Sequence, residues 1–299
     1  MNQRIKSFLM LLAMTIGAVF AEQVRFVDVL SGGILAPALL FAMLFITFCC
    51  VDLRDIRLSM LHLWIILFQL FTGIGSYYLL LPLCGEILAQ GVMVCFITPV
   101  AMAAVVIGRI LGGNVLNIAS FSIACNVVMA LFIPLFFTHI GGEGCSFSQI
   151  LIKVGPLMVL PPFVAQLIRY TTPSITTWFG KRGYISYYLW LVSLVITVGR
   201  TVSFVSANMS DIELFLGLAL AFGALITCVI QYRVGHLLGL KYGDPAGAQQ
   251  SLGQKNTILA IWMTQTFLSP IASIAPTSYV IWQNLMNSYK IFKHSVENK

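Results

Sequence analysis

The sequence predicts an all-α polytopic membrane protein with ten transmembrane helices. Of its 299 residues, 59% are hydrophobic and only 9% are charged, whereas a soluble domain carries about 25% charged residues. The apolar residues form long runs of roughly the 20 residues that a helix needs to cross a bilayer. The sequence lacks the alternating pattern of a membrane β-barrel, and helices satisfy their own backbone groups in lipid.

Ten apolar segments are predicted to span the membrane. They cover residues 7–24, 30–51, 59–83, 87–110, 115–140, 150–168, 185–204, 214–238, 248–268 and 271–291. The first segment follows Arg4 and Lys6 and ends near Val19-Phe20-Ala21, a pattern that also resembles a cleavable signal peptide. Cleavage there would leave nine spans. We favour a retained helix, because the connection between the first two apolar runs is short.

The distribution of basic residues predicts that both termini lie in the cytoplasm. In that orientation Arg25 and Arg200 fall in outside loops, and Lys153 and Lys255 fall within spans. The other thirteen basic residues lie on the cytoplasmic side: Arg4, Lys6, Arg54, Arg57, Arg109, Arg169, Lys181, Arg182, Arg233, Lys241, Lys290, Lys293 and Lys299. This excess is the positive-inside pattern. Short loops and the lack of an organellar targeting peptide indicate a bacterial inner membrane.

Composition and motifs argue against several other classes of function. The net charge of +7 comes from scattered residues, not from the basic groove or tail of a nucleic-acid-binding protein. The seven cysteines form no CxxC pair and have no histidine at metal spacing, so we expect neither a disulfide framework nor a metal site. The sequence contains no nucleophile elbow, phosphate loop or HExxH motif, and we therefore expect neither an enzyme nor a cofactor.

Two predicted spans, the fourth and the ninth, contain helix-breaking residues. The fourth carries Thr98-Pro99 in its middle, and the ninth carries Gly253-Gln254-Lys255-Asn256. Proline removes a helical hydrogen bond and glycine lets the backbone turn; a simple kink and a chance polar patch are the alternative. Because ten spans divide into five and five, the matching breaks predict two inverted repeats, residues 1–140 and 141–299. Such repeats are typical of transporters that work by alternating access, and they favour a transporter over a channel.

Ionisable residues are distributed unevenly between the spans and the loops. No aspartate or glutamate lies in the middle of a span, but Lys255 does. A charge at that depth is energetically costly and marks a functional candidate. The alternative is a lysine that extends its ammonium to the membrane surface or is neutral; the position of Lys255 in mid-span favours a function. Because burial disfavours the charged form of a lysine, Lys255 is also a candidate for proton exchange.

Several of these motifs resemble those of the bile acid:sodium symporter family, over most of the chain. Residues 96–114 are similar to the fourth helix of that family and the turn into its fifth, and residues 251–260 (SLGQKNTILA) resemble its ninth-helix motif Glu-x-Gly-x-Gln-Asn. Pro270 and residues 279–284 (YVIWQN) fit the tenth helix, and Gln69 falls where the third helix supplies a sodium-site glutamine. The resemblance implies a panel domain and a core domain, with helices four and nine broken and crossing beside the substrate crevice.

The sequence departs from this family where the resemblance places the sodium ions. Ser251 stands in place of the glutamate that helps to hold both ions, and Lys255 in place of the motif glutamine. Other sodium-site positions are occupied by Met102, Ala104, Val105, Ile118 and Ser122. Most of the oxygen ligands that a hard cation needs are therefore missing. The family's residues remain at Pro99, Asn114, Gly253 and Asn256.

The resemblance and these departures together predict a secondary transporter of an organic anion, either bile-acid-like or a small carboxylate. Transport would not use sodium: Lys255 would replace the coupling cation and could exchange a proton, while Thr98 and Asn256 orient the anion. A degenerate member that binds a ligand without transporting it, as a sensor or scaffold, is the alternative. The expected partners are membrane lipid and the anion. The candidate substrate and coupling residues are Gln69, Thr98, Pro99, Met102, Asn114, Ser122, Ser251, Gly253, Gln254, Lys255 and Asn256.

Overall fold

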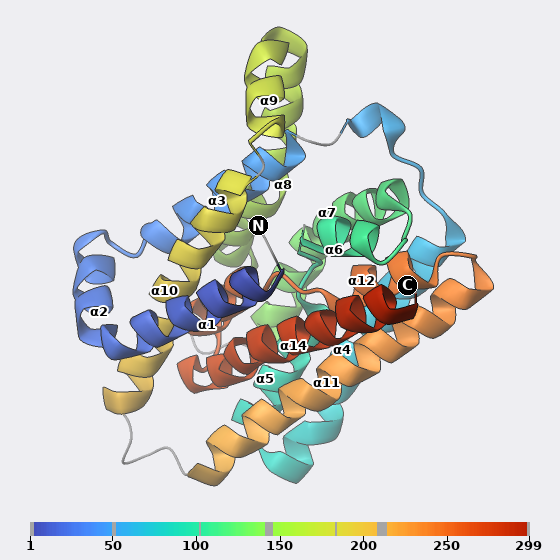
Figure 1. The fold of residues 1–299 in the computed structure, drawn as a ribbon. Coiled ribbons are helices and arrows are strands. Elements are labelled where there is room, and N and C mark those ends of the chain that lie inside the picture. Colours follow the sequence, from blue (N-terminus) through green and yellow to red (C-terminus); the bar gives the residue numbers. More distant parts are fainter. Residues whose placement is uncertain are drawn as a thin grey trace. The chain divides into compact units, whose positions relative to one another are not determined.

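A computed structural model (Figure 1) describes residues 3–49, 52–101, 103–140, 146–182, 184–207 and 214–297. The described residues form α-helices joined by short connections, which confirms the all-α class. Within the described ranges, five helices are long and apolar enough to cross a membrane: α4 (Met60–Cys84), α7 (Val115–Ile140), α8 (Phe147–Thr171), α10 (Tyr184–Ala207) and α11 (Leu214–Lys241). These helices indicate an integral membrane protein. The larger number of ten spans and the repeat layout remain predictions.

A sixth candidate span is a bent pair of helices near the N-terminus. Helices α2 (Ala21–Leu30) and α3 (Leu35–Phe48) meet at an angle of 86°. Gly32 and Gly33 lie in the bend with φ values of 62° and 72°, a left-handed conformation that glycine adopts at little cost. The sequence predicted a loop before residue 30, and this prediction is wrong because α2 is helical.

The two acidic residues of α2 hold this helix against α10. The Ser203 hydroxyl donates to Glu22 Oε1 at 3.1 Å, and Arg200 Nε lies 3.3 Å from Asp28 Oδ2. The sequence predicted that Arg200 lies in an outside loop. This prediction is wrong, because Arg200 lies inside α10. A partly buried partner of opposite charge allows a basic residue to lie within an apolar helix.

The chain divides into two compact units. The first comprises Met1–Asp55, Ala130–Asp211 and Thr266–Pro270; the second comprises Ile56–Met129, Ile212–Gln265 and Ile271–Lys299. Each unit draws segments from both predicted repeats, so the units are a different division of the chain from residues 1–140 and 141–299. The remaining helices of the first unit are α1 (Gln3–Val19), α9 (Pro173–Gly180) and the short 3-10 helix η1 (Leu53–Asp55).

The second unit contains the interrupted helices. Besides α4 and α11 it includes α5 (Glu86–Ile97), α6 (Ala103–Ile110), α12 (Pro245–Gly253) and α14 (Ile274–Glu297). The boundary between the units passes through α7, through α13 (Thr257–Phe267) and through the short 3-10 helix η2 (Pro270–Ser273).

In the first unit, α1 packs closely against α10 through glycines. A Cβ atom added at Gly17 of α1 would lie 2.5 Å from the carbonyl oxygen of Val195. One added at Gly199 of α10 would lie 3.0 Å from the Gly17 carbonyl oxygen and 2.7 Å from Val24 Cγ1 of α2. Neither position has room for a side chain. Small residues at helix contacts let the backbones approach, which is how helices gain packing energy in lipid.

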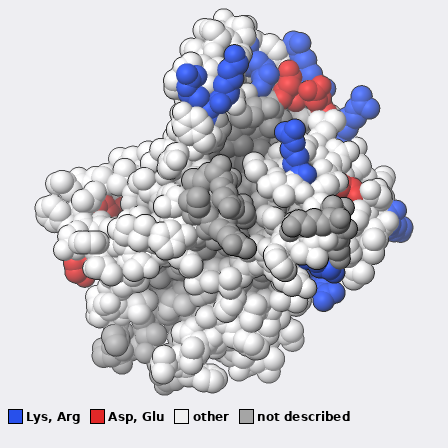
Figure 2. Space-filling model, viewed as in Figure 1, with Lys and Arg blue, Asp and Glu red and all other residues white. Residues whose placement is uncertain are grey.

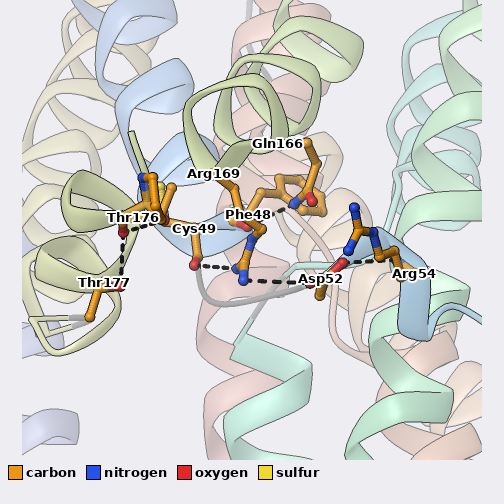
Figure 3. A network of polar contacts seen from close by, with 9 residues as sticks. Phe48, Cys49, Asp52, Arg54, Gln166, Arg169, Thr176 and Thr177 are labelled. Atoms are coloured by element: carbon orange, nitrogen blue, oxygen red, sulfur yellow. Dashed lines mark hydrogen bonds and ion pairs between the residues drawn. The ribbon is translucent and has the colours of Figure 1, made fainter. Parts of the chain in front are cut away.

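A polar network links the ends of α3 and α8 in the first unit (Figure 3). Arg169 Nη2 donates to the carbonyl oxygen of Cys49 at 2.7 Å, and Arg169 Nη1 lies 3.8 Å from Asp52 Oδ2. Gln166 Nε2 donates to the Phe48 carbonyl at 3.4 Å. These donors satisfy carbonyl groups at the end of α3 that have no helical partner. Figure 2 shows Lys and Arg side chains gathered around the neighbouring α9.

In the second unit, α11 packs against α5, α12 and α14 (Figure 1). Its buried face contributes Leu220, Ala224, Cys228 and Tyr232 to one apolar cluster. Tyr279 of α14 belongs to the same cluster. This core packs α5 and α14 against the long continuous helix α11, which also contacts α12.

Candidate functional site at two crossing helix breaks

The helices break at the two positions that the sequence predicted. Helix α5 ends at Ile97 and α6 begins at Ala103, while α12 ends at Gly253 and α13 begins at Thr257. Thr98 has a ψ of 132°, the extended conformation expected of a residue that precedes proline. Gln254 is also extended, with a ψ of 101°. At both breaks the backbone therefore leaves the helical path inside an otherwise apolar segment.

The two unwound segments lie against each other within the second unit. Val100 and Lys255 form an antiparallel bridge. The Ala101 amide donates to the Gln254 carbonyl at 2.8 Å, and the Asn256 amide donates to the Pro99 carbonyl, also at 2.8 Å. Each break thus satisfies backbone groups that the other has freed. Non-helical backbone at membrane depth is stable only with such partners.

Lys255 lies at the centre of this crossing and is only 1% exposed. Its ammonium Nζ donates to the Phe96 carbonyl oxygen at 3.0 Å, and its backbone amide donates to Gln283 Oε1 at 3.0 Å. Phe96 is in the last turn of α5, where carbonyl groups lack helical partners and carry the negative end of the helix dipole. The lysine charge is therefore placed where a cation is favoured.

The charge of Lys255 is not balanced by a carboxylate in the part of the chain that the structure describes. The two ion pairs found there are Arg169–Asp52 and Arg200–Asp28. A buried charge in a protein is normally paired, or is neutralised by a change in protonation. A lysine whose Nζ contacts a main-chain carbonyl and no carboxylate is therefore a candidate for proton exchange.

Gln69 of α4 completes the cap on the broken end of α5. Its Nε2 group donates to the carbonyl oxygens of Ile97 and Thr98, at 3.0 and 2.8 Å. The Cys125 thiol lies 3.7 Å from Gln69 Oε1. Carbonyl and amide oxygens are the ligands that hard cations prefer. Here the carbonyl oxygens are bound by the Lys255 ammonium and the Gln69 amide.

A second polar cluster holds the broken end of α12. Gln254 Oε1 accepts from Asn287 Nδ2 at 2.6 Å and lies 3.1 Å from the Tyr232 hydroxyl. The Tyr232 hydroxyl is also 2.9 Å from Asn287 Oδ1, which accepts from Gln250 Nε2 at 3.0 Å. All four side chains are buried. They connect α11, α12 and α14 just beside the unwound segment.

Tyr279 ties the same break to α5. Its hydroxyl donates to the Gly253 carbonyl at 2.8 Å and accepts from Gln231 Nε2 at 3.1 Å. Gln231 Nε2 also donates to the Cys95 carbonyl at 3.1 Å. The carbonyl oxygen Gln231 Oε1 is buried without a hydrogen-bond partner. The two broken ends therefore share one network of side-chain donors.

Sequence reasoning missed several members of these clusters, namely Gln231, Tyr232, Gln250 and Asn287. Each is a buried polar residue within a predicted membrane span. Such residues in membrane spans usually face the protein interior, and this signal could have identified them.

The other predicted site residues turn their polar groups toward the protein. The Thr98 hydroxyl donates to the Val94 carbonyl at 2.6 Å. Asn256 Oδ1 accepts from the Leu259 amide at 3.3 Å and so caps α13. Ser122 and Ser251 are buried as well. Met102 lies outside the described residues.

Asn114 has its described contacts away from the crossing. Its Oδ1 atom accepts from the amides of Leu116 and Asn117 at the start of α7. Its backbone amide donates to Asp244 Oδ1 at 3.1 Å. Asp244 also caps α12 by accepting from the Gly247 amide at 2.9 Å. Asn114 therefore joins the start of α7 to the start of α12, at the opposite end of α12 from the break.

Comparison of the sequence with protein-family models and with curated proteins found no match. The resemblance to the bile acid:sodium symporter family therefore rests on the motifs and on no wider similarity. The geometry itself offers a buried lysine amine at the contact of two helix breaks. A site of this kind can bind or steer an anion and can gain or lose a proton.

Proposed function

We propose that this protein is a secondary transporter of organic anions in which Lys255 takes the place of a coupling cation. The observation that carries the proposal is the Lys255 ammonium, which is buried where two broken helices meet and is held by the Phe96 carbonyl. Intramembrane charges are costly and usually mark a transport pathway or a coupling site. Broken helices at membrane depth are also typical of transporter binding sites.

The helix N-termini that follow the two breaks favour an anionic substrate. Helices α6 and α13 both begin immediately after the breaks, and the N-terminus of a helix carries partial positive charge. The ammonium of Lys255 adds a full positive charge at the same crossing. Lys255, Thr98 and Asn256 are buried. They therefore act on the substrate through this electrostatic field and through the shape of the backbone, and not by the direct contact that the sequence predicted for Thr98 and Asn256. A carboxylate-bearing substrate fits this field.

A lysine can replace a coupling ion because its charge is reversible. A sodium ion supplies positive charge by binding and removes it by leaving. Lys255 would supply the charge while protonated and remove it by releasing the proton. The proposed cycle therefore needs no sodium, and it makes transport dependent on pH.

A second candidate function is a ligand-binding sensor or scaffold that does not transport. One observation favours it: the polar groups of Thr98, Asn256 and Lys255 all make hydrogen bonds within the protein. These contacts would also suit a crossing that is locked in one conformation. Measured uptake separates the two functions, since a sensor or scaffold would not move the anion across the membrane.

The test is uptake into proteoliposomes of labelled cholate, as a sterol acid, and labelled lactate, as a small carboxylate. We expect Lys255→Gln to reduce uptake by about tenfold or more, because the charge at the crossing is lost. Lys255→Arg should retain the charge but lose the dependence on pH, since arginine does not release its proton. Lys153→Gln is the matched control, because Lys153 is exposed on α8.

Unchanged circular dichroism and elution volume must accompany the loss in Lys255→Gln, which would exclude unfolding as its cause. Full uptake by Lys255→Gln would contradict the coupling role of Lys255. No uptake of either anion by the native protein would favour the sensor or scaffold.

A further inference from the structure

Basic residues gather on two neighbouring helices of the second unit. Arg233 and His236 lie three residues apart on α11, and Lys290 and Lys293 lie three residues apart on α14. The two helices pack together. Lys290 Nζ lies 6.0 Å from the centre of the ring of Tyr232, the neighbour of Arg233. We call Arg233, His236, Lys290 and Lys293 the basic cluster.

The members of the basic cluster repel one another. Arg233 and Lys293 repel the positive charge of Lys290, and Arg233 and Lys290 repel the positively charged form of His236. Neither of the two ion pairs in the described part of the chain involves Arg233 or Lys290. Like charges at short range destabilise a fold unless an anion lies between them. The cluster is therefore suited to bind an anion.

Exposed apolar residues lie among these basic residues. Leu237 and Leu240 of α11 are 62% and 58% exposed, and Tyr289 and Phe292 of α14 are 62% and 63% exposed. They follow the helical spacing of the basic residues, so each helix shows both kinds of side chain on one face. Figure 2 shows Lys and Arg side chains beside the ends of α11 and α14.

The position on α11 identifies the kind of anion. Helix α11 is an apolar helix of 28 residues that is long enough to cross a membrane, and the cluster begins in its last turns. Lys, Arg and aromatic residues at the end of a membrane helix lie at the level of the lipid headgroups. A soluble anion would gain nothing from the apolar side chains, whereas a phospholipid can use them for its acyl chains.

We propose that the basic cluster binds the phosphate headgroup of an anionic phospholipid. The acyl chains would lie along Leu237, Leu240, Tyr289 and Phe292. This site is separate in sequence from the crossing at Lys255, and it does not depend on the proposed transport function. Its role would be to stabilise the contact between α11 and α14.

The test is thermal unfolding of the detergent-solubilised full chain during titration with short-chain phosphatidylglycerol, phosphatidylcholine or inorganic phosphate. We expect phosphatidylglycerol alone to raise the unfolding temperature. In Arg233→Gln/Lys290→Gln this rise should fall by about half or more, because two of the three Arg and Lys residues of the cluster are removed. Lys181→Gln/Arg182→Gln, a pair beside α9, is the control and should keep the full rise.

Three results would overturn the proposal. An equal rise with phosphatidylcholine would mean that the charge does not matter, and a full rise in Arg233→Gln/Lys290→Gln would place the lipid elsewhere. A rise with inorganic phosphate alone would assign the cluster to a soluble anion.

Should the double variant not fold, two further measurements test the proposal. The charge-preserving Arg233→Lys/Lys290→Arg must keep the rise, and the rise in the native protein must shrink with added NaCl.

Discussion

Gly253 packs closely against the ring of Tyr232 at the crossing, and this contact gives a sharp prediction for Gly253→Ala. A Cβ atom at this position would clash with three carbons of the ring, the farthest of them at 2.7 Å. The ring has little freedom to move, because Tyr232 is 1% exposed and its hydroxyl lies within hydrogen-bonding distance of Gln254 and Asn287. The added methyl group must therefore shift the end of α12 or break this cluster.

Adding a methyl group to a packed core costs about 1–3 kcal/mol, and a lost hydrogen bond from Tyr232 adds roughly 0.5–1.5 kcal/mol. We therefore expect Gly253→Ala to lower the free energy of unfolding by about 2–4 kcal/mol. The matched control is Gly217→Ala on α11, where a Cβ atom would meet nothing within 4 Å. That change should be neutral or stabilising by up to about 1 kcal/mol.

The assay is reversible unfolding in mixed micelles by titration with SDS. A double-mutant cycle with Tyr232→Ala tests the cause, because removal of the ring removes all three close contacts. In that background Gly253→Ala should cost no more than about 0.5 kcal/mol. Native stability of Gly253→Ala, or an equal loss in both backgrounds, would refute the packing argument.

Two further predictions concern residues that hold the crossing and its surroundings. Tyr279→Phe removes the donor to the Gly253 carbonyl and the acceptor for Gln231. It should lower the free energy of unfolding by about 1–3 kcal/mol in the same assay, and native stability would contradict the assigned contacts. Asp244→Asn replaces a carboxylate that accepts from Asn114, Asn117 and Gly247. Because one acceptor becomes a donor, this change should also lower the free energy of unfolding by about 1–3 kcal/mol. A loss of stability no larger than that of the exposed Asp55→Asn would show that these bonds contribute little.

The sequence predicted the helical class and both helix breaks because each has a local cause. Apolar runs of membrane length and the pair Thr98-Pro99 are visible without any tertiary contact. The interruption near Gly253 could also be predicted, since glycine and three polar residues follow one another in an apolar segment. Local chemistry thus located the positions at which the backbone leaves the helix.

Partners across the fold could not be predicted, because they depend on packing. Phe96 contributes only a main-chain carbonyl to Lys255, and any residue type offers the same group. Helix α2 was missed because its contacts with Arg200 and Ser203 lie far along the chain. Tyr232 and Asn287 join the site only through the packing of α11 against α14.

The most direct test of the central claim is uptake by the native protein in proteoliposomes, with sodium present or replaced by potassium, at two pH values. Our account predicts that uptake of the organic anion is the same in sodium and potassium and changes with pH, because Lys255 supplies the charge and exchanges the proton. Strict dependence on sodium would contradict the account. It would mean that a sodium site is built from other residues and that Lys255 does not replace the coupling cation.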